Sequence, residues 1–250
     1  MPPVLSVNVN KVALLRNSRG RNEPDLLAAI DTVIAAGAAG ITVHPRRDER
    51  HVRLADVPVV ARHLREHHRG IELNVECEDH PSLVDLVLEV TPDQCTLVPV
   101  TPGEVTSDHG WDLPRESDRL RPTLRRLRNA GIRTSGFADT GAPMAAFANV
   151  GFDRAELYTG PFAWAWGTSE RQARTVELAT AAASARRAGL GINAGHDLDR
   201  HNVAGVRDLP GLLEVSIGHA IVCRALEVGL TTAVRELVQA LHPPDARPSP

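Results

Sequence analysis

The segment PDLLAAIDTVIAAGAAGITVH, residues 24–44, contains the pattern that decides the fold. A run of Ala, Leu and Ile with helical spacing is followed by glycines and then by a short apolar run, residues 40–43, which ends at the polar residue His44. Similar short runs of Val, Ile and Leu alternate with helical segments along the chain, which is typical of βα units around a parallel sheet. The expected strands are residues 4–9, 40–43, 72–75, 94–98, 133–137, 154–157, 191–193 and 213–217.

Eight strands in 250 residues give about 31 residues for each βα unit, which predicts a single-domain (β/α)8 TIM barrel, an α/β fold. Ala-Gly pairs at residues 39–40, 130–131 and 188–189 are expected to end helices in a left-handed residue. We expect the barrel to cover residues 1–242 and residues 243–250 to form a disordered tail. A doubly wound open sheet is the alternative fold, and such a fold normally has a glycine-rich phosphate-binding turn after its first strand. Here residues 8–20, NVNKVALLRNSRG, follow the first strand, are expected to form a long polar loop, and lack that motif.

The composition excludes several classes of protein. The formal net charge of −3 and a charged fraction of 24% indicate no nucleic-acid partner. No apolar run is long enough to span a membrane, and the start, MPPVLSVNVN, does not resemble a secretory signal, so we expect no membrane partner and a cytoplasmic location. Cys77, Cys95 and Cys223 lack CxxC spacing and are expected to be reduced, buried and inert.

Polar residues follow the expected strands, at the end of a barrel where active sites form. They are Asn8, Asn10, Lys11, His44, Arg46, His51, Glu76, Thr106, Glu156, His196 and His219. Each one taken alone is more often a structural or solvent-exposed residue, and for Asn10 and His51 that interpretation is at least as good as a functional one. Gathering so many ionisable groups on one face is costly unless they bind a charged molecule or exchange protons, so a functional site is favoured.

Two kinds of site fit these residues. His44, Glu76, His196 and His219 could hold zinc or iron at the barrel mouth. Arg16, Arg19 and Arg46 instead favour phosphate or carboxylate ligands and would repel a cation, and the segment SIGHA offers a glycine amide at a helix start as a phosphate seat.

Seven segments together resemble the pyridoxine 5′-phosphate synthase family over nearly the whole chain. They are VNVNKVALLRNSRG, AGAAGITVHPRRDERHV, LNVE, LVPVTPGEVTSDHGWDL, AELYTG, INAGHDLDRHNV and SIGHAIVCRAL. The resemblance implies a (β/α)8 barrel that condenses 3-amino-2-oxopropyl phosphate with 1-deoxyxylulose 5-phosphate, with no organic cofactor or metal. It also implies a homo-oligomer, commonly an octamer, in which the first loop of one subunit can approach the site of its neighbour.

The resemblance assigns roles residue by residue. His44 and Glu76 resemble the proton acceptors of the family, His196 its proton donor, and Glu156 the carboxylate that assists the transition state. The amino-ketone phosphate would bind at Asn8, Gly218 and His219, and the pentulose phosphate at Arg19, Arg46, His51 and Thr106. Residues 101–114 are expected to form a lid over reactive intermediates.

The chain departs from the family pattern near the expected ligands. Asn10 and Lys11 replace an Asp and a His that touch the pentulose, Asp197 replaces a Gly, and Tyr158 replaces a His. Bulky Trp111, Trp164 and Trp166 are also expected around the ligand. Two alternatives therefore stay open: a divergent relative that accepts another carbonyl partner, with Lys11 as a possible Schiff-base former, and a barrel that only binds a phosphorylated metabolite.

Overall fold

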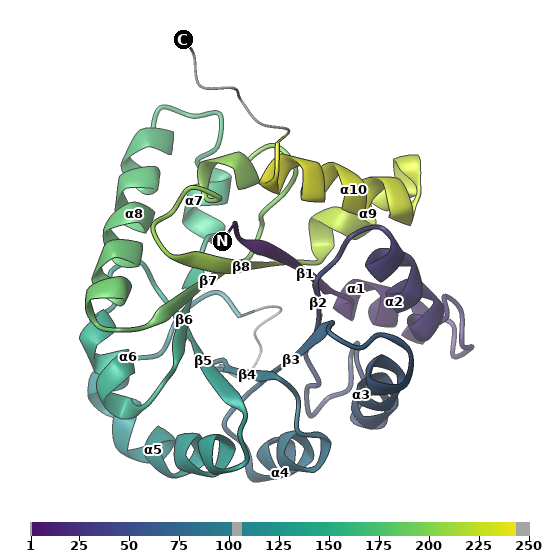
Figure 1. The fold of residues 1–250 in the computed structure, drawn as a ribbon, viewed down its shortest axis with the longest axis horizontal. Coiled ribbons are helices and arrows are strands. Elements are labelled where there is room, and N and C mark those ends of the chain that lie inside the picture. Colours follow the sequence, from purple (N-terminus) through teal and green to yellow (C-terminus); the bar gives the residue numbers. More distant parts are fainter. Residues whose placement is uncertain (1, 102–106, 244–250) are drawn as a thin grey trace.

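The computed structural model describes residues 2–101 and 107–243, which form a closed parallel barrel with the strand order β1-β2-β3-β4-β5-β6-β7-β8. The strands are β1 Val4–Asn8, β2 Gly40–Val43, β3 Glu72–Cys77, β4 Gln94–Leu97, β5 Arg133–Ala138, β6 Arg154–Tyr158, β7 Gly191–Gly195 and β8 Leu212–Ile217. Figure 1 shows the strands as a central ring with helices around it, and β1 pairs with both β2 and β8 to close that ring. The predicted (β/α)8 barrel is confirmed.

The helices lie between the strands along the chain and cover the outside of the barrel (Figure 1). They are α1 Asn10–Asn17, α2 Leu26–Ala35, α3 Asp56–His67, α4 Pro81–Val90, α5 Leu113–Asn129, α6 Met144–Val150, α7 Gly160–Trp164, α8 Arg171–Arg187, α9 His219–Val228 and α10 Leu230–Leu241, with a short 3-10 turn η1 Val203–Gly205. None of the helices in the described ranges is long and apolar enough to cross a membrane.

Each strand separates an apolar outer side from a polar inner side. In β1 the side chains of Leu5 and Val7 belong to the apolar core between strands and helices. The alternate residue Ser6 hydrogen-bonds through Oγ to Thr42 Oγ1 of β2 at 2.7 Å, inside the barrel. The apolar core therefore surrounds the barrel, whereas the barrel interior carries buried polar groups that lead up to the mouth.

Several local expectations were wrong. The segment after β1 is not a polar loop, because α1 begins at Asn10, where the buried residues Val12, Ala13 and Arg16 share one helix face. The helix α2 ends before Gly37, which has φ 112°, and Gly40 lies inside β2, whereas Gly131 and Gly189 have positive φ as expected.

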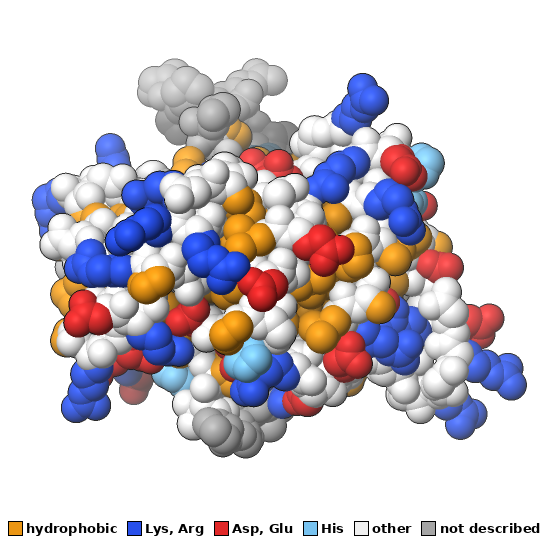
Figure 2. All heavy atoms as spheres, turned by 90° about the horizontal axis from the view of Figure 1, so that it is seen from below, with side chains coloured by type: hydrophobic (Ala, Val, Ile, Leu, Met, Phe, Trp, Pro, Cys, Tyr) orange, Lys and Arg blue, Asp and Glu red, His pale blue; other side chains and the backbone are white. Residues whose placement is uncertain are grey.

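The surface and the cysteines add two further findings. Cys77 and Cys95 are buried as predicted, but Cys223 of α9 is exposed. In the face shown in Figure 2, basic and acidic side chains are interspersed, so no single sign of charge covers it. The expected disordered tail lies outside the described residues, except Pro243.

Candidate active site

His44 and Glu76 come from neighbouring strands and meet at the barrel mouth. His44 directly follows β2, Glu76 lies near the end of β3, and the two strands pair in parallel. His44 Nδ1 lies 3.3 Å from Glu76 Oε2, while His44 Nε2 is buried without a hydrogen-bond partner among the described residues. A carboxylate at Nδ1 favours the tautomer with a proton there, which leaves Nε2 free to accept a proton from a bound molecule.

Glu156 lies deeper in the mouth and is 3% exposed. Burial raises its pKa well above the usual value, and the nearby charges of Glu76 and Glu214 add to the shift against an opposing hydrogen bond from Thr96. Oε2 of Glu156 is buried without a partner among the described residues. Burial therefore favours the protonated form of this carboxyl group, which can donate a proton, over the ionised form.

The turn after β7 places Gly195 beside this carboxyl group, and the ring of the following His196 packs near Phe137 and Tyr158. Gly195 leaves room for Glu156, because a Cβ at Gly195 would collide with Glu156 Oε1. His196 and Asp197 both have positive φ, 87° and 55°, which costs free energy for residues with a side chain. The buried Thr159 hydroxyl stabilises this turn by donating to the carbonyl oxygens of Gly195 at 2.6 Å and His196 at 2.5 Å.

The ionisable groups of this mouth influence one another. Burial lowers the pKa of His196, and the charges of Glu76 and Asp197 oppose that shift. His44 adds to the lowering, so His196, His44 and Glu76 are close enough to interact electrostatically. These side chains therefore lie close together at the mouth of the barrel.

Asn8 and Asn10 shape the mouth where β1 ends. Asn10 Oδ1 accepts the backbone N–H of His44 at 2.9 Å, so its side chain positions His44. Asn8 packs against Gly218, where a Cβ would lie 2.6 Å from the Asn8 carbonyl oxygen. Glycine is therefore required at residue 218 for the close approach of β1 and the β8 end.

Gly218 is the N-cap of α9 and His219 is its first residue. The first N–H groups of a helix have no partner within the helix, so this end can bind an anion. Nε2 of the exposed His219 lies 3.4 Å from Cys223 Sγ. The two residues expected from the SIGHA segment thus lie at a helix start next to Asn8.

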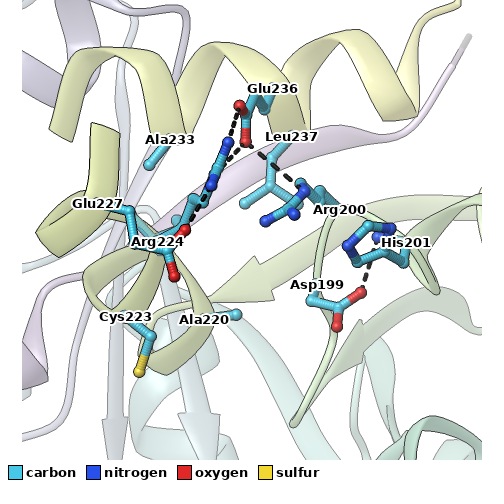
Figure 3. A pocket seen from close by; sticks show the side chains of 11 residues that line it. Asp199, Arg200, His201, Ala220, Cys223, Arg224, Glu227, Ala233, Glu236 and Leu237 are labelled. Carbon is cyan, nitrogen blue, oxygen red and sulfur yellow. Dashed lines mark hydrogen bonds and ion pairs between the residues drawn. The ribbon is translucent and has the colours of Figure 1, made fainter. Parts of the chain in front are cut away.

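A hollow of about 200 Å³ adjoins α9, but it is not a second anion seat (Figure 3). Figure 3 shows the Arg224 guanidinium between two carboxylates: Glu236, at 2.7 and 2.8 Å, and Glu227, at 2.5 Å. Arg200 reaches the same Glu236 at 3.8 Å. The cations in this hollow are already paired, so the network joins α9 to α10 instead.

The expected pentulose side contains Arg46 and His51, which are both buried. Burial lowers the pKa of His51 to about 3, and the charges of His44, Arg46 and the half-buried Lys11 add to that effect. The Nδ1 atom of this neutral imidazole accepts the Val52 N–H at 3.0 Å, so Nε2 carries the proton and can donate it.

Other expected residues lie elsewhere. Arg19 follows α1 and is exposed, and Arg16 is paired through two nitrogens with Asp56 at 2.7 and 2.9 Å, which makes it structural. Thr106 lies outside the described residues, as do residues 102–105 of the expected lid. From the described part of the lid, Ser107 accepts a hydrogen bond from Arg46 at 3.3 Å.

The three tryptophans do not all surround the site as expected. Trp111 is buried in the apolar core and donates to the Leu97 carbonyl at 2.8 Å, and Trp166 packs against Phe162 and Arg171. Trp164 alone reaches the turn after β7, where its Nε1 donates to Asp197 Oδ2 at 2.8 Å.

The alternative of a metal site at the barrel mouth finds no matching ligand cluster among residues 2–101 and 107–243. In these ranges, three or more potential ligand atoms come within 4.8 Å of one another only at Asp31, His63 and His68, which lie outside the barrel. His44, Glu76, His196 and His219 do not form such a group.

Sequence analysis missed Thr159, Gly195 and the polar interior below the mouth. The signal was present, because polar residues recur at every second position of the strands, as in Glu72, Asn74 and Glu76 of β3. Alternation inside a parallel barrel, where both strand faces are buried, indicates that the inner face binds something polar.

Comparison with known proteins connects this geometry with a family. The family model described as "Pyridoxal phosphate biosynthesis protein PdxJ" matches residues 5–243. A curated relative named pyridoxine 5′-phosphate synthase from Xanthomonas axonopodis pv. citri is 46% identical over 251 aligned residues, covering 97% of this chain and 98% of the relative. Relatives of the same name from Xanthomonas campestris pv. campestris (strain B100) and Leptospira biflexa are 48% and 43% identical, covering 92% and 95% of this chain and 93% and 96% of theirs.

Solved structures with low identity share the fold alone. The tryptophan synthase A-subunit from Pyrococcus furiosus has a TM-score of 0.64 at 14% identity, covering 95% of this chain and 97% of its own. Thiamine phosphate pyrophosphorylase from the same organism has a TM-score of 0.58 at 13% identity, covering 96% and 95%. The family match and the curated relatives carry the assignment: this chain belongs to the pyridoxal phosphate biosynthesis protein PdxJ family.

Proposed function

We propose that this chain is a pyridoxine 5′-phosphate synthase, which condenses 3-amino-2-oxopropyl phosphate with 1-deoxyxylulose 5-phosphate and releases phosphate and water. One observation carries the proposal: at the barrel mouth, Glu76 lies 3.3 Å from His44 and is close enough to interact electrostatically with both His196 and the buried Glu156, whose pKa is raised. The reaction joins an amine to a ketone, loses water and phosphate and closes a ring, so protons move at every step.

Each group would act according to its protonation. Nε2 of His44 would accept protons, with Glu76 orienting the ring and stabilising the imidazolium that forms. Glu156 would donate its proton to a departing hydroxyl group, because burial raises its pKa and favours the protonated form. His196 is neutral in the free protein, and a phosphate dianion bound beside it would raise its pKa and prepare it to donate.

In this proposal, two anion-binding sites lie on either side of these groups. The start of α9, with Asn8, Gly218 and His219, would bind the amino-ketone phosphate through free helix N–H groups. Arg46 and the Nε2–H of His51 would bind the pentulose phosphate from the opposite side, with Lys11 as a further cation nearby. Arg19 and Thr106 complete that seat only if the first loop and the lid close over it.

The assay supplies both substrates to the purified protein and measures pyridoxine 5′-phosphate and inorganic phosphate. We expect turnover, a loss of roughly 10²–10⁴-fold in His44→Ala, and wild-type rates in His67→Ala, an exposed histidine at the end of α3, opposite the mouth of the barrel. Tight ligand binding without turnover would indicate a binding barrel, and turnover only with another carbonyl partner would indicate a divergent relative. Borohydride trapping tests Lys11, because no reduced adduct under turnover argues against an imine there.

We further propose a homo-oligomer, an octamer as in the family resemblance, that acts in the cytoplasm. Apolar side chains support assembly: Leu15 of α1 is 52% exposed and Leu226 of α9 is 81% exposed, and these two helices pack against each other. Light scattering on the purified chain tests the assembly, and a monomer at micromolar concentration would contradict it.

A further inference from the structure

One cluster of metal-binding side chains lies outside the active site. Asp31 of α2 and His63 of α3 meet His68, the residue that ends α3, and their ligand atoms all lie within 4.8 Å of one another. Oδ1 of Asp31 lies 2.6 Å from Nε2 of His63 and 2.6 Å from Nε2 of His68. Figure 1 shows α2 and α3 as neighbours in the outer ring.

The local backbone brings the two imidazoles together. His63 and His68 are five residues apart, a spacing that does not align side chains on a regular helix. His68, however, leaves the helix with φ −133° and ψ 55°, while its N–H still donates to Leu64 O at 2.8 Å. The ring centroids of His63 and His68 are therefore only 5.3 Å apart.

The convergence of both Nε2 atoms on one oxygen suits a cation better than two protons. As a purely hydrogen-bonded cluster, both rings must carry a proton on Nε2, and both protons must point at Asp31 Oδ1. A single cation instead bonds all three atoms at once.

The ligand set and its surroundings select the kind of metal. Two imidazoles and one carboxylate suit Zn²⁺, Co²⁺, Ni²⁺ or Cu²⁺ rather than Mg²⁺ or Ca²⁺. Zinc bonds of about 2.0–2.1 Å in a tetrahedron require ligand atoms about 3.3 Å apart, so the cluster must open by about 0.7 Å. The Asp31 side chain is 48% exposed and can move outward, and water would occupy the fourth position. The guanidinium group of the nearby Arg65 donates to the carbonyl oxygens of Val90 and Thr91. Its positive charge therefore points away from the three proposed metal ligands.

We propose that Asp31, His63 and His68 bind one divalent transition-metal ion, such as Zn²⁺, which links α2 to α3. The end of α3 precedes the start of β3, so the site lies at the opposite end of the barrel from the active site. The metal would be structural, with three protein ligands and one open position.

The test titrates metal-free protein with Co²⁺, followed by its visible d–d absorption, and then displaces it with Zn²⁺. We expect one site whose affinity falls at least 100-fold in Asp31→Asn, His63→Ala and His68→Ala. The matched control is His67→Ala, an exposed histidine of the same helix, which should bind within about two-fold of wild type. His219→Ala, near Cys223, should also retain the site.

Thermal unfolding gives a second readout that is independent of enzyme activity. Zinc at about 100 times its dissociation constant should raise the Tm by about 5–10 °C in wild type and His67→Ala, but not in His63→Ala. Absence of tetrahedral Co²⁺ bands, an equal loss of binding in His67→Ala, or a Tm shift that persists in His63→Ala would each overturn the proposal.

Discussion

Replacing Glu156 by Gln should stabilise the protein and inactivate it. The Glu156 side chain is 3% exposed, burial raises its pKa well above 4.5, and the charges of Glu76 and Glu214 raise it further. The folded state therefore holds a proton that the unfolded chain releases above pH 4.5. Because the unfolded state binds fewer protons in that range, the free energy of unfolding of wild type falls as pH rises through it.

The size of the stability difference between wild type and Glu156→Gln follows from the width of this pH range. Each pH unit between the unfolded and folded pKa values costs at most about 1.4 kcal/mol, so the cost at pH 7 is at most about 3.5 kcal/mol. Gln has the shape of the protonated acid and cannot ionise, so Glu156→Gln should avoid this cost. For a chain of this size the Tm gain at pH 7 is at most about 14 °C, and it should vanish near pH 4.

The assay is thermal unfolding of wild type and Glu156→Gln between pH 4 and pH 8. The matched control is Glu170→Gln, whose side chain is 68% exposed, and it should stay within about 0.5 kcal/mol of wild type at every pH. Turnover of Glu156→Gln should fall by about 10²-fold or more, because a proton donor is lost. A stability difference that does not change with pH, or a variant less stable than wild type at pH 8, would refute the argument.

Three further changes test the geometry of the mouth. Gly195→Ala should lower kcat about 100-fold, because its new methyl group would collide with Glu156 Oε1 and displace that carboxyl group. Thr159→Val should cost about 1–2 kcal/mol of stability and lower kcat more than it raises KM, since the His196 carbonyl oxygen loses its hydroxyl donor, whereas the Gly195 carbonyl oxygen keeps the backbone N–H of residue 159. Glu76→Gln should lower kcat by roughly 10²–10⁴-fold and change its pH profile, because His44 loses the carboxylate 3.3 Å from Nδ1.

Each of these three predictions can be contradicted by a specific outcome, and the first also has a control variant. Gly141→Ala adds the same methyl group on an exposed loop with no heavy atom within 4 Å, so it should keep wild-type kinetics. Equal losses in Gly195→Ala and Gly141→Ala would show that the collision is not the cause. Thr159→Val with unchanged kcat would show that the turn does not position His196, and an unchanged pH profile in Glu76→Gln would remove its role toward His44.

Much of the barrel could be predicted because its signals are local. Strand β2 was predicted with the correct ends, and the other strands within about two residues, since apolar runs and helix-ending glycines mark them. The first helix was missed because Asn10, Lys11 and Arg16 look polar in sequence, although Arg16 is buried against Asp56, a residue 40 positions away. Only the folded chain supplies that partner.

The candidate site was predicted in part for the same reason. His44, Glu76 and His196 each follow an apolar run, so their strand-end positions could be recognised. The roles of Thr159 and Gly195 depend on contacts between β6 and β7, which no spacing in the sequence records. The cluster of Asp31 with two histidines was likewise invisible, because it depends on the non-helical backbone of a single residue.

The polar interior of the barrel explains how Glu156 can stay both buried and protonated. The side chains of Ser6, Thr42, Asn74 and Thr96 form a continuous hydrogen-bonded row across four neighbouring strands, with distances of 2.7, 3.4 and 3.0 Å. Thr96, at the end of the row, also bonds to Glu156. An apolar interior would leave the acid with no partner, and a cation there would ionise it. The hydroxyl and amide network gives Glu156 a neutral partner, while burial and the charges of Glu76 and Glu214 raise its pKa, so the protonation state of the site depends on the charged and the uncharged residues around it.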